Sequence, residues 1–436
     1  MIHKYSLRIE KPSRDRRLLT STFFSNQVVL FLVEFAPYIV ALSIVGFFTT
    51  KKSFRLIPAM FLPGVIGILV VGIVLGSYED AKVKGFDMSK PSLRDALESY
   101  IETGEGDAVK IIESGEYAPT LGYQELKYLL TDLITHTLLH LDTHNGMNIP
   151  VAYNKGNDWF RATLGEPMVY TSGIYENGNE SLIEAQNHKL DFVAESIQLK
   201  KGENVLDIGC GWGRLAKYFT DKYGAKVTGV TLSEEQKKYA DMLNSDNGAK
   251  IVLQDAMKLY KRKDLVPEGG FDKITCLEMA EHVGIKRYDE FLSHVHNLLK
   301  DDGTLYFQVA GLRREWQYED IAWGLFMGEH IFPGADASTP MGWVTTHLER
   351  NGFEVQRVHN LGTHYSRTLF QWLEEWYAAK DAMIAKYGAK EWRRWEVFLA
   401  WSVRIARQGS STVFMIAATK HGQEDTRINA QAHLAP

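Results

Sequence analysis

Cysteine is scarce in this 436-residue sequence, which contains only Cys210 and Cys276. Two cysteines exclude a disulfide framework, and their scarcity suits a reducing compartment. The sequence also lacks a dense tract of lysine and arginine, and its formal net charge is −5. This balance excludes a strongly basic nucleic-acid surface, so no nucleic-acid partner is expected. Repeats and low-complexity tracts are lacking too, and no metal ion is expected.

Long apolar runs, in contrast, are present early in the sequence. Residues 28–48 (VVLFLVEFAPYIVALSIVGFF) contain one charge, Glu34, and residues 56–75 (LIPAMFLPGVIGILVVGIVL) contain none. A membrane-spanning helix needs roughly 20 apolar residues, and both runs reach that length. They favour a transmembrane hairpin over a helical hairpin in a soluble core or a cleaved signal peptide. Glu34 is interpreted as packing against the other helix rather than as a functional acid.

The charges around these runs predict the orientation of the hairpin. Its connector, TTKKSFR, is short, so both outer flanks lie on one side of the membrane. The connector carries three basic residues, and the flanks carry eight: Lys4, Arg8, Lys11, Arg14, Arg16, Arg17, Lys82 and Lys84. The positive-inside rule therefore places the flanks in the cytoplasm, although the charges of the connector favour the reverse.

After the hairpin, the sequence first predicts helices and then, from about residue 190, strands that alternate with helices. We expect a cytosolic segment at 1–27, two transmembrane helices within 28–76, a helical connector at 77–150, an α/β domain at 151–420 and a polar tail at 421–436. Candidate strands are 204–208, 226–232, 250–254, 271–278, 304–310, 353–359 and 412–420. Helical stretches between them predict a mostly parallel sheet covered on both faces. Ligands bind such sheets at the carboxyl ends of the strands.

A glycine-rich loop follows the first of these strands, in VLDIGCGWG at residues 205–213. Its alternate glycines, Gly209, Gly211 and Gly213, match neither the dinucleotide-binding G-x-G-x-x-G nor the phosphate-binding P-loop. Asp207 precedes them, and its carboxylate suits a cationic amino group better than a pyrophosphate. The pattern resembles motif I of class I S-adenosylmethionine-dependent methyltransferases. The glycines alone also fit a tight turn packed against a helix.

Further motifs occur in order around this loop: GEPMVYTSGIY, GVTLSEEQ, LQD, EMAEHVG, IFPG and GTHYSRTL, between residues 165 and 369. Together they resemble the cyclopropane fatty acid synthase family of lipid methyltransferases, over residues 153–420. The resemblance implies a Rossmann-like, seven-stranded class I methyltransferase domain with S-adenosylmethionine as methyl donor. It implies that the donor is held by Gly209, Cys210, Gly211 and Gly213, by Asp207 at its amino group, by Tyr170 and Thr171 over its methionine end, by Thr231, Leu232 and Gln236 at the ribose, and by Asp255 and Ala256 at the adenine. Cys210 also fits as a small residue in a tight loop.

Enzymes of this family add the methyl group to an alkene carbon of a lipid chain. An alkene is a weak nucleophile, so alignment and desolvation must supply much of the rate. The resulting carbocation needs a base that removes one proton. Loss of a proton from the added methyl closes a cyclopropane, whereas loss from the methylated carbon leaves a branched alkene.

The predicted catalytic positions depart in part from this family. Its cyclopropane synthases use a bicarbonate as base, held by Cys, Glu, His and Tyr side chains. The resemblance keeps the Glu as Glu281 and the Tyr as Tyr365, but Ser172 stands at the Cys position and Gln308 at the His position. A neutral glutamine holds an anion less well than a histidine cation. Glu281 also fits as a helix-start acid, and Tyr365 as a core aromatic.

The segment YTSGI, the apolar hairpin and GEHIFPGADAS resemble the sphingolipid C9-methyltransferases. These membrane enzymes of the secretory pathway methylate C9 of the 8-unsaturated long-chain base and retain a double bond. The resemblance implies a sphingolipid substrate, such as ceramide or glucosylceramide, and an endoplasmic reticulum membrane with the catalytic domain in the cytosol. Three rival hypotheses are a true cyclopropane synthase, a small-molecule N-methyltransferase and an inactive membrane protein that only binds ligands. The sequence predicts neither the headgroup nor the oligomeric state.

Half of the ten tryptophans lie late in the sequence: Trp372, Trp376, Trp392, Trp395 and Trp401. Trp372 and Trp376 are four residues apart and share one helix face. The group fits either core packing or an amphipathic platform at the bilayer surface.

Overall fold

The computed structural model describes residues 90–119, 155–314, 317–332 and 339–422. The chain divides into two compact units, Met1–Asp80 and Ala81–Pro436, and every described residue belongs to the second. The predicted transmembrane hairpin at 28–76 lies outside the described residues. Within the described part, no helix is both long and apolar enough to span a bilayer.

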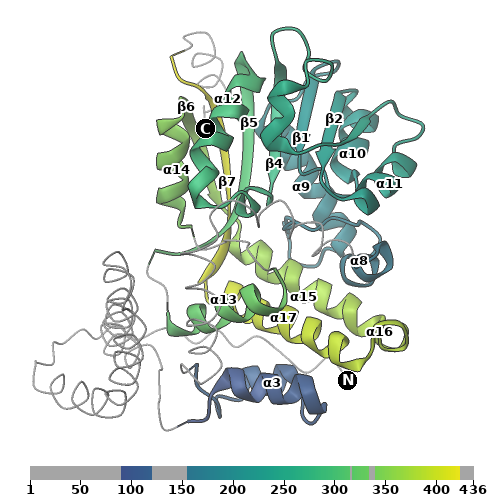
Figure 1. The fold of residues 1–436 in the computed structure, drawn as a ribbon, viewed down its shortest axis with the longest axis vertical. Helices are drawn as coiled ribbons and strands as arrows, with labels where there is room; N and C mark the ends of the chain where they lie inside the picture. Colours follow the sequence, from purple (N-terminus) through teal and green to yellow (C-terminus); the bar gives the residue numbers. More distant parts are fainter. Residues whose placement is uncertain (1–89, 120–154, 315–316, 333–338, 423–436) are drawn as a thin grey trace, which may run out of the picture. The chain divides into compact units, whose positions relative to one another are not determined.

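A seven-stranded sheet forms the centre of the second unit (Figure 1). Its strands are β1 (Asn204–Ile208), β2 (Lys226–Thr231), β3 (Lys250–Leu253), β4 (Phe271–Leu277), β5 (Leu299–Leu312), β6 (Phe353–Asn360) and β7 (Ser411–Lys420). Their order in the sheet is β3-β2-β1-β4-β5-β7-β6. β1 to β5 run parallel, and β7 is antiparallel to both of its neighbours. The prediction of a mostly parallel, seven-stranded sheet is therefore confirmed.

Helices cover both faces of the sheet because its strands are apolar on both sides. In β1, Val205 packs into the cluster formed with α9 (Leu182–Ser196), α10 (Arg214–Tyr223) and α11 (Glu234–Leu243). Its neighbour Leu206 points the opposite way, toward α12 (Tyr288–Leu298) and α14 (Met341–Arg350). This alternation has the period of two expected of a strand. Three short 3₁₀ turns, η2 (Ala256–Lys261), η3 (Ala280–His282) and η4 (Ile285–Arg287), connect the elements on the second face.

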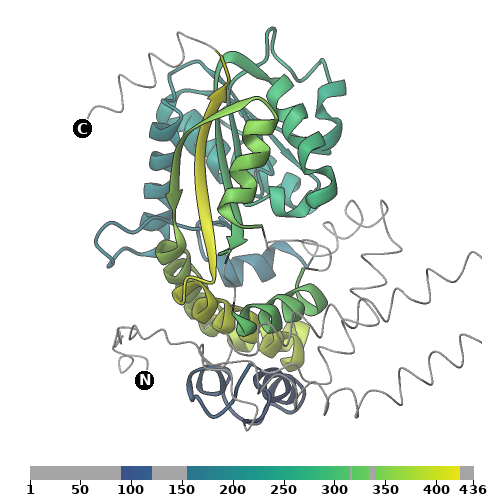
Figure 2. The same ribbon diagram turned by 90° about the vertical axis from the view of Figure 1, so that its left-hand side faces the viewer.

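A separate layer of helices lies beyond the carboxyl ends of the parallel strands (Figures 1 and 2). It consists of α8 (Asn157–Leu164), α13 (Tyr318–His330), α15 (Gly362–Ala378), α16 (Lys380–Tyr387) and α17 (Ala389–Arg407). The five late tryptophans are at most 3% exposed and belong to the apolar cluster of this layer. Their interpretation as core residues is confirmed, and a platform made of these side chains at a bilayer surface is wrong.

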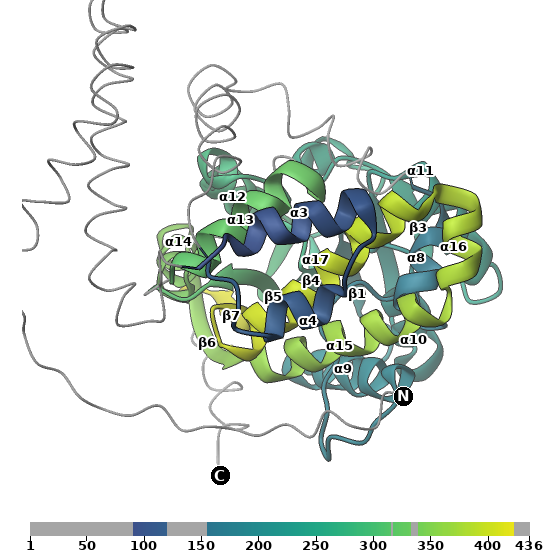
Figure 3. The ribbon, with the colours of Figure 1, turned by 90° about the horizontal axis from the view of Figure 1, so that it is seen from below.

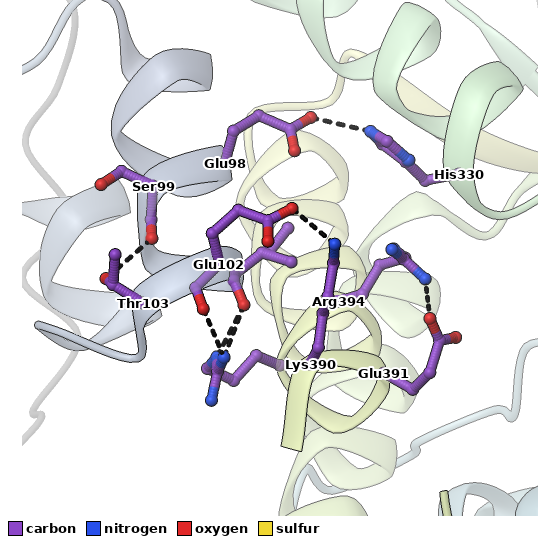
Figure 4. A network of polar contacts seen from close by, with 10 residues as sticks. Glu98, Ser99, Glu102, Thr103, His330, Lys390, Glu391 and Arg394 are labelled. Atoms are coloured by element: carbon purple, nitrogen blue, oxygen red, sulfur yellow. Dashed lines mark hydrogen bonds and ion pairs between the residues drawn. The ribbon is translucent and has the colours of Figure 1, made fainter. Parts of the chain in front are cut away.

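Two further helices, α3 (Leu93–Thr103) and α4 (Ala108–Glu113), pack against α17 (Figure 3). In the interface between α3 and α17, the buried Tyr100 of α3 donates a hydrogen bond to the Glu396 carboxylate of α17 over 2.6 Å. Figure 4 shows the polar contacts at the edge of this interface, where Lys390 of α17 reaches Glu102 of α3 at 2.6 Å. The predicted connector at 77–150 thus contributes helices to the same compact unit.

Candidate functional site

A pocket of about 200 Å³ lies at the carboxyl ends of β1, β2, β3 and β4. This is the edge where the parallel sheet was expected to bind its ligand. The pocket is lined by all but one of the residues predicted to hold the methyl donor: Tyr170, Thr171, Asp207, Gly209, Cys210, Gly211, Thr231, Leu232, Gln236, Asp255 and Ala256. The exception is Gly213.

The glycine loop begins at Gly209, whose φ of +78° is a left-handed conformation that favours glycine. A Cβ added to Gly211 would meet nothing within 4 Å, so the loop leaves open space at this point of the pocket wall. Gly213 has a different structural role: it is the N-cap residue of α10 and has a φ of +81°. A Cβ there would lie 2.7 Å from the Cβ of Ala240 in α11. Gly213 therefore permits close helix packing and does not line the pocket.

One end of the pocket carries buried charges. Asp207 is 3% exposed, and its carboxylate accepts a hydrogen bond from the Thr275 hydroxyl over 2.8 Å. Burial raises the pKa of Asp207 to about 6, although the Thr275 hydrogen bond and nearby Lys189 lower it. The carboxylate is thus ionised at neutral pH and suits a cationic amino group.

The other end of the pocket combines hydroxyl, amide and apolar groups with the Asp255 carboxylate. Thr231, at the end of β2, donates a hydrogen bond to the side-chain carbonyl of Gln236 over 2.7 Å. Asp255 caps η2 by accepting from the backbone N–H of Met257 at 2.9 Å. Met257 and Phe291 add apolar walls here. A pocket with an acid at one end, hydroxyl and amide groups between, and apolar walls at the other fits S-adenosylmethionine in its chemistry.

Lys189 of α9 is a pocket residue that sequence reasoning missed. It is 1% exposed, and its ammonium donates a hydrogen bond to the Thr171 hydroxyl over 2.7 Å. Burial lowers the pKa of Lys189 to about 8, while the charges of Glu278 and Asp207 raise it. Nothing local in α9 marks this lysine, because its partners come from distant parts of the sequence.

Glu278, the residue after β4, was missed as well and also lines the pocket. It is the first residue of the EMAEHVG motif, which was its only signal in the sequence. Its carboxylate accepts hydrogen bonds from the Ser172 backbone N–H at 2.9 Å and from the Gln308 side-chain amide at 2.7 Å. Burial raises the pKa of Glu278, although these two donors and Lys189 lower it.

The structure brings together only part of the predicted catalytic set, since Ser172 and Gln308 share Glu278 as a partner. Both are fully buried behind the pocket wall and do not line it. The Ser172 hydroxyl donates to the carbonyl of Gly173, and Gln308 also accepts from Tyr306 at 2.9 Å. The altered Gln308 side chain thus holds a protein carboxylate in place, together with the backbone N–H of Ser172.

Glu281 and Tyr365 occupy other surroundings. Glu281 lies on η3, lines a small separate cavity with Tyr288 and Val309, and accepts a hydrogen bond from the backbone N–H of Ala310. Burial, together with the Glu278 charge, raises the pKa of Glu281 to about 8. Tyr365 is a half-buried residue of α15 that packs against two of the apolar clusters. Neither lines the larger pocket, and their catalytic roles stay predictions.

Next to Glu281, His282 does line the larger pocket. Burial lowers the pKa of His282 to about 4, so its imidazole is neutral at physiological pH.

Comparison with known proteins gives close relatives for most of the chain. A sphingolipid C9-methyltransferase from Komagataella phaffii is 45% identical over 306 residues, which cover 68% of this chain and 62% of that protein. Sphingolipid C9-methyltransferase 2 from Gibberella zeae is 42% identical over 335 residues, covering 74% and 63%. The match thus spans less than two thirds of either relative.

Among solved structures, the mycolic acid cyclopropane synthase CmaA1, complexed with SAH and CTAB, is 29% identical with a TM-score of 0.58. The match covers 64% of this chain and 99% of that protein. The family model described as mycolic acid cyclopropane synthetase matches residues 140–416, which include the pocket, the helical layer and the sheet up to the middle of β7. Because this match spans more than half of the sequence, the chain belongs to the mycolic acid cyclopropane synthetase family.

Proposed function

We propose that this protein transfers a methyl group from S-adenosylmethionine to C9 of the 8-unsaturated long-chain base of a sphingolipid. The product keeps a double bond and carries a methyl branch. The observation that carries the proposal is the 45% and 42% identity to two sphingolipid C9-methyltransferases, over the region that contains the pocket. The chemistry of the pocket lining supports it independently.

The pocket residues define how the methyl donor is held. When bound, S-adenosylmethionine supplies an electrophilic methyl group on a sulfonium. The Asp207 carboxylate would pair with its amino group, and the open backbone at Gly211 would let the ligand approach closely. Thr231 and Gln236 would hold the ribose, and Asp255 and Ala256 the adenine. Tyr170 and Thr171 would cover the methionine end, and excluding bulk water there would strengthen the electrostatic contacts.

Cyclopropane synthesis is the second candidate function. The family description and the 29% identity to CmaA1 favour it. Against it, Ser172 and Gln308 stand at two of the four positions that hold bicarbonate in those enzymes by resemblance, and here the Gln308 side chain and the Ser172 backbone N–H both donate to Glu278. An N-methyltransferase for small molecules is a weaker candidate, because the apolar runs at 28–48 and 56–75 suit an enzyme whose substrate lies in a membrane.

We further propose that residues 28–76 anchor the enzyme in the endoplasmic reticulum membrane, with the catalytic domain on the cytosolic side. The two apolar runs support the anchor, and the excess of basic residues on their outer flanks supports its orientation. The endoplasmic reticulum is implied only by the resemblance to sphingolipid C9-methyltransferases. An anchored enzyme meets its lipid substrate within the bilayer.

The test is an assay of the purified full-length protein in detergent. It receives S-adenosylmethionine and, in parallel, ceramide and glucosylceramide that carry an 8-unsaturated base, and the products are measured by mass spectrometry. We expect the mass of the base to rise by one CH₂ without loss of the double bond. A ring-containing product supports the cyclopropane alternative, and unchanged lipids contradict both.

A further inference from the structure

Glu278 presents an acceptor to the pocket from a constrained position. Its backbone has a φ of +50°, a left-handed conformation that is uncommon outside glycine and occurs often at functional sites. Its N–H donates to the backbone carbonyl of Gln308 over 2.7 Å, which joins it to β5. The two hydrogen bonds to its carboxylate, from the Ser172 backbone N–H and the Gln308 side-chain amide, both end on Oε1. Oε2 carries neither of them and is available to accept a proton.

The ammonium of Lys189 keeps this carboxylate charged. Lys189 is fully buried and interacts electrostatically with Glu278 and Asp207. A carboxylate removed from water is stable as an anion only beside a cation or hydrogen-bond donors. Glu278 has both, so it can remain an anion in the pocket while burial makes it more basic than an exposed glutamate.

The other titratable groups near the site are less suited to accept a proton from the substrate. His282 has a pKa of about 4 and is a weak base. Glu281 has a pKa of about 8, so it is mostly protonated at neutral pH, and it does not line the pocket. Asp207 is already bonded to Thr275 and is assigned to the amino group of the methyl donor.

We propose that Glu278 is the catalytic base of the reaction, a built-in carboxylate that makes a bound bicarbonate unnecessary. This inference rests on the proposed function. The π electron pair of the alkene forms the bond to the incoming methyl, and the bond between that methyl and sulfur breaks with its pair left on sulfur. The adjacent chain carbon becomes cationic. Oε2 of Glu278 then takes the proton from the methylated carbon, and the C–H electron pair restores the double bond. The proton passes to water after the product leaves.

Glu278→Gln in the full-length protein tests the assignment. The variant keeps an oxygen for Ser172 and Gln308 but loses the negative charge. We expect the turnover number to fall by roughly 100-fold or more, in the range for loss of a general base. Affinity for S-adenosylhomocysteine, measured by calorimetry without lipid, should stay within about threefold of the wild type. Glu396→Gln is the matched control, because Glu396 is also buried and accepts two hydrogen bonds but lies in the helical layer.

Glu278→Gln removes the negative charge of Glu278 beside Lys189 and could therefore misfold. A second variant that keeps this charge tests the assignment without that risk. Glu278→Asp keeps the charge and shortens the side chain by one methylene. With a substrate deuterated at C9, we expect a larger isotope effect on product formation in Glu278→Asp than in the wild type, because proton removal becomes slower. A purely structural role for Glu278 would leave this isotope effect unchanged.

The outcomes separate the two proposals. If Glu278→Gln turns over as fast as the wild type, or if the isotope effect is unchanged in Glu278→Asp, Glu278 is not the base. A loss of more than tenfold in S-adenosylhomocysteine affinity also overturns its role as base, and assigns Glu278 to the amino group of the methyl donor. A wild-type protein that methylates no lipid contradicts the proposed function itself. An active wild type with carbonate-dependent turnover contradicts only the inference, because it identifies an external base.

Discussion

At the scale of single residues, Glu278 and Glu281 show how two acids three positions apart acquire different properties. Glu278 faces the pocket beside Lys189 and two donors, whereas Glu281 turns toward the backbone N–H of Ala310. Burial and the charge of Glu278 raise the pKa of Glu281 to about 8. Glu281 is therefore mostly a neutral acid at pH 7.

This raised pKa predicts a pH-dependent contribution of Glu281 to stability. The folded pKa exceeds that of the unfolded chain, so the contribution is complete below about pH 4.5 and is lost as the pH rises through 8. Glu281→Gln should remove this dependence, because glutamine does not ionise, and the variant should therefore gain stability relative to the wild type as the pH rises from 5 to 8. Urea unfolding of both proteins from pH 5 to 9 measures the difference. Parallel pH profiles for the two proteins would contradict the assignment.

Asp207 predicts the pH dependence of ligand binding. Its pKa of about 6 means that the carboxylate is ionised above this pH and neutral below it. We expect S-adenosylhomocysteine to bind more tightly as the pH rises from 5 to 7, because the ion pair with its amino group then forms. Asp207→Asn should weaken binding by roughly 10-fold or more at pH 7 and flatten the profile. Calorimetry from pH 5 to 7 measures the affinity of both proteins. The same pH dependence in Asp207→Asn as in the wild type would contradict the pairing of Asp207 with the amino group.

The sequence predicted eleven of the residues that line the pocket but missed others, among them Glu278 and Lys189. The loop residues were predictable because their motif is contiguous and its glycines have a backbone reason. Lys189 and Glu278 gain their significance from contacts with Thr171, Ser172 and Gln308, which come from other elements. Such long-range pairing is not visible in local spacing.

At the scale of elements, the glycine loop joins β1 to α10 and sets the distance between α10 and α11. The sequence predicted all seven strands of this sheet, with ends that agree within a few residues except at the start of β5. β7 lies between β5 and β6 and is antiparallel to both, which is determined by pairing between distant segments. The order of the strands could therefore not be predicted from local sequence patterns. For the same reason the sequence left open whether the late tryptophans form a core or a surface.

Gly213→Ala tests the packing of this loop. Gly213 has a positive φ, and an added Cβ would lie 2.7 Å from the Cβ and 3.2 Å from the Cα of Ala240. The matched control is Gly202→Ala, because Gly202 has a φ of +84° but an added Cβ meets nothing within 4 Å. Both variants bear the conformational cost, of about 1–2 kcal/mol. Thermal and urea unfolding should show Gly213→Ala less stable than the control by a further 1–3 kcal/mol or so. Equal stability of Gly213→Ala and Gly202→Ala would show that α11 can shift to accommodate the added Cβ at little cost.

At the scale of the whole molecule, the proposal combines a membrane hairpin at 28–76 with a methyltransferase domain. The hairpin stays a prediction from apolar length and flanking charge. In cells, we expect the full-length protein to remain with membranes after alkaline carbonate extraction. A glycosylation acceptor inserted in the connector at 49–55 should be modified, and one placed after residue 422 should not. Extraction into the soluble fraction would contradict the anchor, and the reverse pattern of glycosylation would contradict the orientation.

Transfer of a labelled methyl group in cells tests the central claim most directly. Cells that make an 8-unsaturated sphingoid base, but no methylated one, express this protein and are fed methyl-labelled methionine, and their long-chain bases and fatty acids are analysed by mass spectrometry. We predict that the label appears in a methyl branch at C9 of the unsaturated base, and in no lipid methyl branch of control cells. Label in fatty-acyl cyclopropanes, or in no lipid at all, would contradict it.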